Sequence, residues 1–199
     1  MAIKLQYNKT FIQQLQKQLA IREKALPTLK SKETALRLEV KKIGDRVVKL
    51  EQELKELTAD ISSAENLWLE YPNILRIEKV DINIRNIAGV KVPEFADLEY
   101  RQIGIHFFHQ QAWIPMGTDQ LKKLIKKTAE IKVERKKYDL LNYARKKTTQ
   151  KVNLYEKVQI PEFREGILKI KRYLEDQENL SKSAQKIIKE RNKIKEAAL

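Results

Sequence analysis

A ladder of apolar residues, spaced alternately by three and four positions, runs through the first third of this 199-residue chain. Fifteen of its 17 positions are apolar, whereas the 42% hydrophobic content of the chain would fill about seven by chance. Residues that repeat in this way form one stripe on a helix, so the segment predicts a single long helix with a coiled-coil seam. At about 1.5 Å per residue, such a helix is roughly 85 Å long, which predicts a rod. The 17 positions are Ile12, Leu15, Leu19, Arg22, Leu26, Leu29, Glu33, Leu36, Val40, Ile43, Val47, Leu50, Leu54, Leu57, Ile61, Ala64 and Trp68.

A second long helix is expected in the last part of the chain, after a turn and N-cap at Gly117-Thr118-Asp119. In the first part of this helix, polar residues occupy about half of the seam positions. From Phe163 onward the seam positions are mostly apolar. The apolar positions of the first part are Leu121, Leu124, Ile131, Tyr138 and Val152, and the polar ones are Thr128, Arg135, Asn142, Arg145 and Thr149. Over both helices, the seam residues that we expect to pack are Leu15, Leu19, Leu29, Leu36, Val40, Ile43, Val47, Leu50, Leu54, Leu57, Ile61, Phe163, Ile167, Ile170 and Leu174.

Two prolines interrupt these helices at positions that we expect to correspond. Two long helices in one chain most simply fold back on each other as an antiparallel pair. If Tyr71 lies opposite Thr118, Pro27 falls beside Pro161. Because a proline inside a helix removes one backbone hydrogen bond, we predict a kink at each of them, and a shared bend where they meet.

The region between the helices has the pattern of a strand. Val80, Ile82 and Ile84 alternate with polar residues, which predicts a half-buried strand. Residues 86–89 then indicate a turn or bulge, and Leu98 to Ile105 could add a further strand. A small β element is therefore expected between the helices.

Together these patterns predict a mostly α-helical chain that forms one elongated domain. Its fold class is a long antiparallel two-helix coiled coil with a small β element between the helices. We expect the N-terminal helix at 5–71, the β and loop element at 72–117 and the C-terminal helix at 118–198. A fragment that starts at Thr118 is expected to be largely unfolded or aggregated, because its own seam is too polar.

The composition fits such a protein inside a cell. Charged residues make up 34% of the chain, and only five glycines and five prolines are available for turns. The lack of cysteine excludes disulfides and thiolate metal sites and fits a reducing compartment. No apolar run reaches 18 residues, and the first ten residues lack the pattern of a signal peptide. We therefore expect a cytoplasmic protein without direct membrane insertion.

Positive charge is concentrated in the second half of the chain. The formal net charge is +14, and the segment from Lys122 to Lys151 contains 12 basic and three acidic residues. Such a segment favours an acidic partner. Nucleic acid is an alternative partner, since phosphates would release counterions, but Tyr138 and Tyr143 are the only aromatics available for stacking. Three interpretations therefore remain open for this surface: a solvated face, an acidic protein partner, or a nucleic-acid arm.

Residues that could carry chemistry are few. His106 and His109 are three positions apart, and only Glu99 is a nearby further ligand, without a recognised spacing. The five glycines are isolated, and none belongs to a phosphate-binding loop. We therefore expect no catalytic residues, no metal site and no cofactor.

Three segments resemble one protein family. Lys151 to Phe163 reads K-V-N-L-Y-E-K-V-Q-I-P-E-F, Ile87 to Pro93 reads I-A-G-V-K-V-P, and Asn8 to Leu36 carries spaced leucines followed by basic residues. All three are similar to the D subunit of the V-type and archaeal-type rotary ATPases, and the similarity covers nearly the whole chain. The chain departs from the family pattern at Arg22, Glu23, Pro27 and Glu33.

This resemblance implies a non-catalytic rotor shaft. One end would lie inside a hexamer of A and B subunits, and the other would face the F subunit and the socket above the membrane ring. ATP hydrolysis or ion flow would turn the shaft. The partner-contact candidates are Gly89, Val90, Val92, Pro93, Lys136, Lys137, Arg145, Lys146 and Lys147. The alternative is a basic coiled-coil adaptor that binds nucleic acid.

Overall fold

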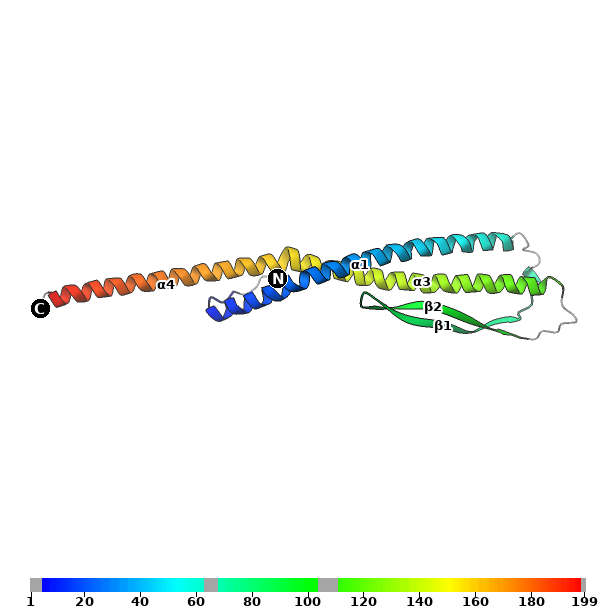
Figure 1. The fold of residues 1–199 in the computed structure, drawn as a ribbon, viewed down its shortest axis with the longest axis horizontal. Coiled ribbons are helices and arrows are strands. Elements are labelled where there is room, and N and C mark those ends of the chain that lie inside the picture. Colours follow the sequence, from blue (N-terminus) through cyan, green and yellow to red (C-terminus); the bar gives the residue numbers. More distant parts are fainter. Residues whose placement is uncertain (1–4, 63–67, 104–110, 198–199) are drawn as a thin grey trace. The chain divides into compact units, whose positions relative to one another are not determined.

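The computed structural model describes residues 5–62, 68–103 and 111–197. Two very long helical stretches enclose a β-hairpin in the sequence (Figure 1). The two long helices pack together, and the sheet is a two-stranded antiparallel hairpin, so the expected fold class is confirmed. The elements are α1 (Lys9–Ser62), β1 (Leu75–Ile87), β2 (Val90–Gln102), α3 (Ile114–Leu154), the π-helical segment η2 (Tyr155–Gln159) and α4 (Ile160–Ala197).

The chain divides into two compact units that each contain part of both helical stretches. Unit 1 comprises residues 1–31 and 149–199, and unit 2 comprises residues 32–148. In each unit, a segment of α1 packs against a segment of the second helical stretch. The seam of α1 therefore contributes to two separate hydrophobic clusters.

The core of unit 2 lies where α1, α3 and the hairpin meet. Leu36, Val40 and Ile43 from α1 pack with Leu141 from α3 and Val92 from β2. The two helices also approach each other at Gly44, where an added Cβ would make an ordinary van der Waals contact of 3.4 Å with the ring of Tyr138. This close fit places an aromatic side chain of α3 directly against the backbone of α1.

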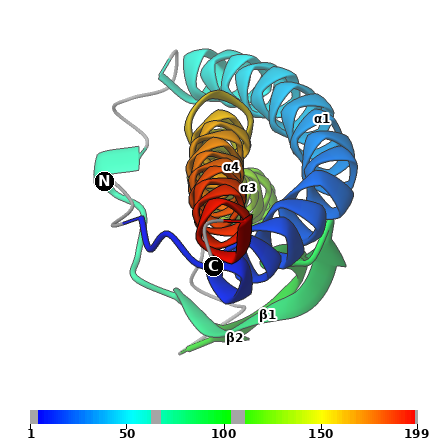
Figure 2. The same cartoon turned by 90° about the vertical axis from the view of Figure 1, so that its left-hand side faces the viewer.

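The hairpin turns at two residues with positive φ. Ala88 has φ 49° and Gly89 has φ 78°, and both strands leave this two-residue turn in the pairing Ile87 with Val90. Positive φ at both central positions is the geometry that suits the right-handed twist of hairpin strands. Figure 2 shows β1 and β2 lying side by side. The turn expected at residues 86–89 is confirmed.

Two expectations for the strands are wrong. Residues 98–102 belong to β2 and do not form a further strand, because β2 continues through Pro93. A proline is tolerated there since a two-stranded sheet has only edge strands. The apolar residues of β1 are also not half-buried: Val80, Ile82 and Ile84 are all exposed, because β2 is the strand that lies against the helices.

The second long helix begins earlier than expected. Its first residue is Ile114, and the backbone N–H of Gly117 already donates to the carbonyl of Trp113. Pro115 lies in the first turn, where its missing N–H costs nothing and its fixed φ favours a helix start. Thr118 is therefore not an N-cap: its hydroxyl donates to the carbonyl of Ile114 within the helix.

The expected pairing of Tyr71 with Thr118 is confirmed. The Tyr71 hydroxyl and the Thr118 Oγ1 are 2.9 Å apart, and Thr118 is buried. The rings of Trp68, Tyr71 and Trp113 cluster beside this bond, with centroid separations of 5.5 to 6.1 Å. This aromatic cluster joins the start of α3 to the segment that precedes β1.

Unit 1 consists of the first turns of α1 packed against η2 and α4. The side chain of Asn8 caps α1, because its Oδ1 accepts a 2.6 Å hydrogen bond from the N–H of Phe11. Leu15 packs against Phe163, Ile167 and Ile170 in the core of this unit. The N-terminal end of α1 meets α4 where the Tyr7 and Tyr173 ring centroids lie 4.7 Å apart.

The last part of α4 continues past this contact without a packing partner in the described chain (Figure 1). Every residue from 175 to 193 is exposed. Antiparallel pairing with Tyr71 opposite Thr118 would place the two termini together and leave only about ten residues of the second helix overhanging, so the observed overhang is longer. The overhang is longer because Tyr7, just before α1, already contacts Tyr173, so the part of α4 beyond this contact has no segment of α1 beside it.

A π-helical segment marks the junction of α3 and α4. The N–H of Ile160 donates to the carbonyl of Tyr155, five residues back, and Pro161 follows directly. In an α-helix the ring of a proline clashes with the carbonyl four residues earlier, and the wider π turn relieves this crowding. In contrast, α1 is continuous through Pro27. Both prolines lie on exposed sides of their helices.

Candidate functional site

The predicted seam residues all lie on the packed sides of the helices. None of these fifteen side chains is exposed to solvent. The buried ones, apart from Leu50, belong to the two cores, and the others are partly buried. The buried members are Leu15, Leu36, Val40, Ile43, Leu50, Phe163, Ile167 and Ile170.

Arg22, one of the two polar residues of the ladder, contacts both η2 and α4 in unit 1. Its guanidinium carbon lies 4.6 Å from the ring centroid of Phe163 and 5.8 Å from that of Tyr155. Its Nε donates a 2.6 Å hydrogen bond to Gln159 Oε1, and its Nη1 donates to Gln18. A guanidinium can stack and donate in its plane at once, so one side chain of α1 holds both η2 and α4.

Two ion pairs cross between α1 and the second helical stretch close to Arg22 in unit 1. Glu23 pairs with Arg164 at 2.6 Å, and Lys30 pairs with Glu156 at 2.6 Å. These pairs bracket Pro27 on α1 and the interval that contains Pro161 on the other helix. The two prolines therefore lie at about the same level of unit 1, as the pairing argument predicts. Exposed pairs of this kind contribute little to stability, but they define which residues face each other.

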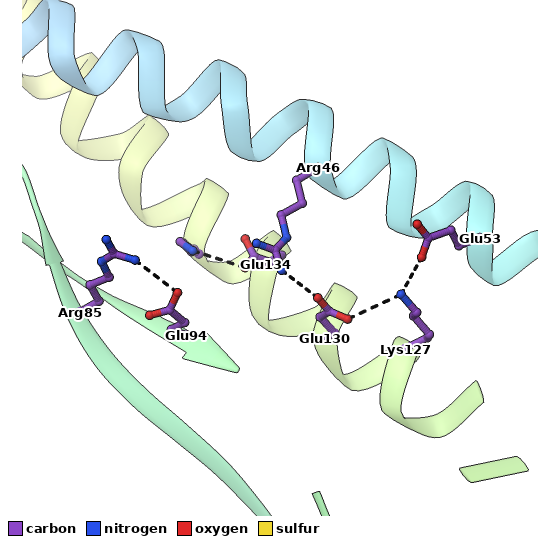
Figure 3. Close-up of polar contacts among 8 residues, drawn as sticks. Arg46, Glu53, Arg85, Glu94, Lys127, Glu130 and Glu134 are labelled. Carbon is purple, nitrogen blue, oxygen red and sulfur yellow. Dashed lines mark hydrogen bonds and ion pairs between the residues drawn. The ribbon is translucent and has the colours of Figure 1, made fainter. Parts of the chain in front are cut away.

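A chain of ion pairs connects α1 with α3 in unit 2. Arg46 Nη2 lies 3.0 Å from Glu130, which also lies 3.9 Å from Lys127, and Lys127 pairs in turn with Glu53 (Figure 3). A further pair joins α1 to α3 nearby: Arg135 donates from Nε and Nη2 to the same oxygen of Glu51. Cross-helix pairs at successive levels fix the register of the two helices.

Carboxylates from two elements surround the guanidinium of Arg46. The pKa of Arg46 is raised, first by its hydrogen bond to Glu130 and further by the negative charges of Glu134, Glu130 and Glu94, against a smaller opposing effect of burial. Glu94 belongs to β2 and pairs with Arg85 at 3.5 Å. The hairpin therefore contributes charge to the same region as the two helices.

A buried ion pair lies on α3 beneath the hairpin tip. Glu134 is 2% exposed and Lys137 is 6% exposed, and their charged atoms are 3.3 Å apart. The second carboxylate oxygen of Glu134, Oε2, has no hydrogen-bond partner among the described residues. The sequence argument missed Glu134, because its stripe on α3 follows Tyr138, whereas the hairpin covers a neighbouring face.

The hairpin-tip candidates for partner contact have unequal access to solvent. Gly89 is exposed, while Val90 and Pro93 are half-buried. Val92 is 1% exposed and belongs to the core of unit 2. Its side chain therefore holds the tip onto the helices and does not reach the surface.

The basic candidates also divide into exposed and buried residues. Lys136, Lys146 and Lys147 are exposed, and Arg145 is half-buried and donates to Asn142. Lys137 is buried with Glu134, so it is not free to meet a partner at the surface. Four of the five candidates thus keep access to solvent.

Much of the positive charge of this region is neutralised within the chain. Of the 12 basic residues from Lys122 to Lys151, five pair with carboxylates in the described structure. The pairs are Lys122–Asp119, Lys126–Asp97, Lys127–Glu53, Arg135–Glu51 and Lys137–Glu134. This pairing weakens the field that a phosphate backbone would meet.

Within residues 5–62, 68–103 and 111–197, no group of three potential metal ligands comes together. His106 and His109 lie outside the described residues, so the structure does not place them. None of the helices in the described ranges is both long enough and apolar enough to cross a membrane.

Comparisons with known proteins agree on one family over nearly the whole chain. The family described as the D subunit of ATP synthase matches residues 12–190. The D subunit of a V-type ATP synthase in Borreliella burgdorferi is 32% identical over 191 residues, covering 94% of each chain. Proteins of the same description in Chlamydia felis and Chlamydia pneumoniae are 28% and 22% identical, covering 90% and 99% of this chain and 91% and 97% of their own.

Proposed function

Since the chain belongs to the family of ATP synthase D subunits and is a non-catalytic component of a V-type ATP synthase, we propose that it is the rotor shaft of that complex. In this role it transmits torque between a catalytic hexamer of A and B subunits and the ion-translocating ring in the membrane. The observation that best supports the proposal is the set of cross-helix contacts in both units, which join α1 to the second helical stretch at successive levels.

A shaft must resist sliding of one helix along the other. In unit 2, sliding by one helical turn, about 5.4 Å, would break the pairs of Arg46 with Glu130 and of Glu53 with Lys127 together. It would also drive the ring of Tyr138 away from Gly44 and against side chains. The individual ion pairs are weak, but sliding requires all of them to break at once, along with the packing of the seam.

We propose that the remaining exposed basic residues of α3 and the hairpin tip contact partner subunits. Lys136, Lys146 and Lys147 have no carboxylate partner among the described residues, and Gly89 is exposed at the tip. The F subunit, acidic loops of the hexamer and the socket above the membrane ring are the proposed partners. Electrostatic contacts of this kind would set orientation and association rate more than affinity. The proposed location is the cytoplasmic side of the membrane, as part of the complex.

The proposed function can be tested by single-molecule rotation. Because the chain has no cysteine, replacing the exposed Lys91 with cysteine provides one unique site for a biotin and a bead. The labelled chain is added to its cognate A/B hexamer lacking a shaft, and the bead is observed during ATP hydrolysis. Rotation that stops when ATP is withdrawn would support the proposal. Hydrolysis by the assembled complex without rotation of the bead would refute it.

A parallel titration with nucleic acid separates the rotor from the adaptor hypothesis. The full chain is titrated with duplex and single-stranded DNA across a range of salt concentrations. We expect weak binding that disappears at physiological salt, since five basic residues are already paired. Sub-micromolar binding under those conditions would favour the nucleic-acid arm instead.

A further inference from the structure

The overhang of α4, residues 175–193, presents a helical seam that no part of the described chain covers (Figure 1). Leu180, Ala184 and Ile187 are four and three positions apart, so they form one stripe on the helix. Leu180 is 70% exposed and Ile187 is 52% exposed. A stripe of this spacing is typical of a helix that packs on another helix, so the overhang lacks a partner for its apolar side.

Charges of opposite sign lie at the two ends of the overhang. Glu175 and Asp176 lie at its start, and Arg191 and Lys193 lie at its end. All four side chains are exposed, and within the described part of the chain none of them forms an ion pair. Both ends of the overhang are therefore free to meet charges of a second helix.

This distribution of charge determines how two such helices can pair. In a parallel pair, Glu175 would face Glu175 of the second copy, and Arg191 would face Arg191, so both ends would repel. In an antiparallel pair centred between residues 183 and 184, Asp176 faces Arg191 of the second copy, and Glu175 lies beside Lys193. Each contact occurs twice because such a pair has a two-fold axis. Opposite charges at both ends therefore favour antiparallel pairing of two copies.

The same centre aligns the apolar residues of the seam. Leu180 lies opposite Ile187 of the second copy on each side of the axis, and Ala184 lies at the axis. A small side chain at this point lets the two helices approach closely. The overhang contains five basic and four acidic residues, so its net charge is +1, against +14 for the whole chain. Charge repulsion therefore opposes contact at the overhang less than elsewhere on the chain.

We propose that the free chain forms an antiparallel dimer through this overhang, with a second copy of itself as the partner. At about 1.5 Å per residue the paired segment is roughly 28 Å long, and few apolar side chains become buried. We expect reversible pairing with a dissociation constant on the order of 100 µM. The dimer must dissociate before the overhang can contact another protein. This pairing concerns the unassembled chain and does not depend on a role as rotor shaft.

The experiment uses the full chain, which contains no cysteine, so that one substitution creates one thiol per copy. A disulfide between copies forms only where two Cα atoms come within about 7 Å. Ala184→Cys places the thiol at the proposed axis, and we expect mild oxidation to produce a covalent dimer on a non-reducing gel. Lys186→Cys is the matched control, because residue 186 lies about 200° further around the same helix. We expect it to cross-link at least tenfold more slowly.

Charge reversal in the Ala184→Cys background tests the orientation. One variant carries Glu175→Lys with Asp176→Lys, and the other carries Arg191→Glu with Lys193→Glu. Each variant alone has like charges at both ends of the seam, so we expect cross-linking to slow at least tenfold. An equal mixture should restore it as a mixed dimer, identified by a short tag on one of the two chains. Recovery in the mixture shows that neither variant has lost its helix.

Sedimentation of the unmodified chain measures the pairing without a cross-link. We expect a shift from monomer to dimer as the concentration rises from tenfold below to tenfold above the expected dissociation constant. A monomer over this whole range would overturn the proposal and leave the seam to a different protein. Equal cross-linking of the Ala184→Cys and Lys186→Cys chains would also overturn it, as would a charge-reversed mixture that cross-links no faster than its components.

Discussion

Replacing Leu141 with alanine should strongly destabilise unit 2. Its side chain has 0% exposure and lies in the cluster that also contains Leu36, Val40, Ile43 and Val92. The substitution removes three buried carbons, worth about 0.8 kcal/mol each, and leaves a cavity where three elements meet. We expect a loss of about 3 kcal/mol in the free energy of unfolding, within the range of about 2 to 5 kcal/mol for such changes.

Tryptophan fluorescence during heating measures this effect. Both tryptophans of the chain, Trp68 and Trp113, lie in unit 2 and contact each other, so their emission reports on the unfolding of that unit. A loss of about 3 kcal/mol should lower the melting temperature by about 6 to 12 °C, at about 2 to 4 °C per kcal/mol for a chain of this size.

The preceding residue provides the matched control. Leu140 has the same side chain on the same helix but is 39% exposed, so Leu140→Ala should cost at most about 1 kcal/mol. The seam predicted from the sequence runs through Tyr138 and does not include Leu141. Equal destabilisation by the two alanine variants would refute this packing of α3.

Three further predictions follow from individual contacts. Arg22→Lys keeps the charge but loses the planar stack on Phe163, and should cost about 1 kcal/mol when urea unfolding is followed by circular dichroism. Gly89→Ala places a side chain at φ 78° and should destabilise the hairpin by about 1 to 2 kcal/mol, detected as faster amide exchange in β1 and β2. The hydrogen bond from Lys126 holds the pKa of Asp97 below its ordinary value of 3.8, so its stabilising effect is present above that value and is lost as the pH falls through the lower, folded-state pKa. Asp97→Asn should therefore flatten the acid side of the stability curve, and an unchanged slope would contradict this account.

The long helices and their packed side could be predicted from the sequence because one physical pattern determines both. An apolar ladder over several heptads has no other regular structure, and each of its predicted seam residues is at least partly buried. The turn at Ala88 and Gly89 could be predicted for a similar reason, since few residue types adopt positive φ. These features depend on neighbours in the sequence.

The burial of the hairpin could not be predicted in the same way. Alternation in β1 indicates a strand with two different faces, but it does not say whether anything covers the apolar face. Val80, Ile82 and Ile84 remain exposed because β2, through Tyr100 and the buried Leu98, is the strand that contacts α3. Which strand lies against the helices depends on tertiary packing and not on the period of the pattern.

The core of α3 is wider than the predicted stripe for a related reason: Ile131 and Tyr138 pack as expected, but further residues are buried beside them. A coiled-coil seam assumes one partner, whereas α3 meets both α1 and the hairpin in unit 2. Its buried surface is therefore wider than a heptad stripe and includes Leu141, Glu134 and Lys137. A buried charged pair in such a stripe looks like a solvated helix face in the sequence, so the pair of Glu134 and Lys137 could not be recognised.

The departures from the family pattern gain a physical explanation from the contacts of unit 1. Arg22 and Glu23, two of these departures, bond to Gln159 and Arg164, and Pro27 lies at the level of Pro161. Arg22 and Glu23 are thus each matched by a residue of η2 or α4, whereas Glu33 pairs with Arg37 on α1 itself. A change on α1 alone would leave a polar group or a charge without its partner, so these residues act as pairs. We infer that exchanging only Arg22 and Glu23 for small residues would weaken unit 1 more than exchanging both sides together, and a double-mutant cycle with Gln159 and Arg164 measures that coupling.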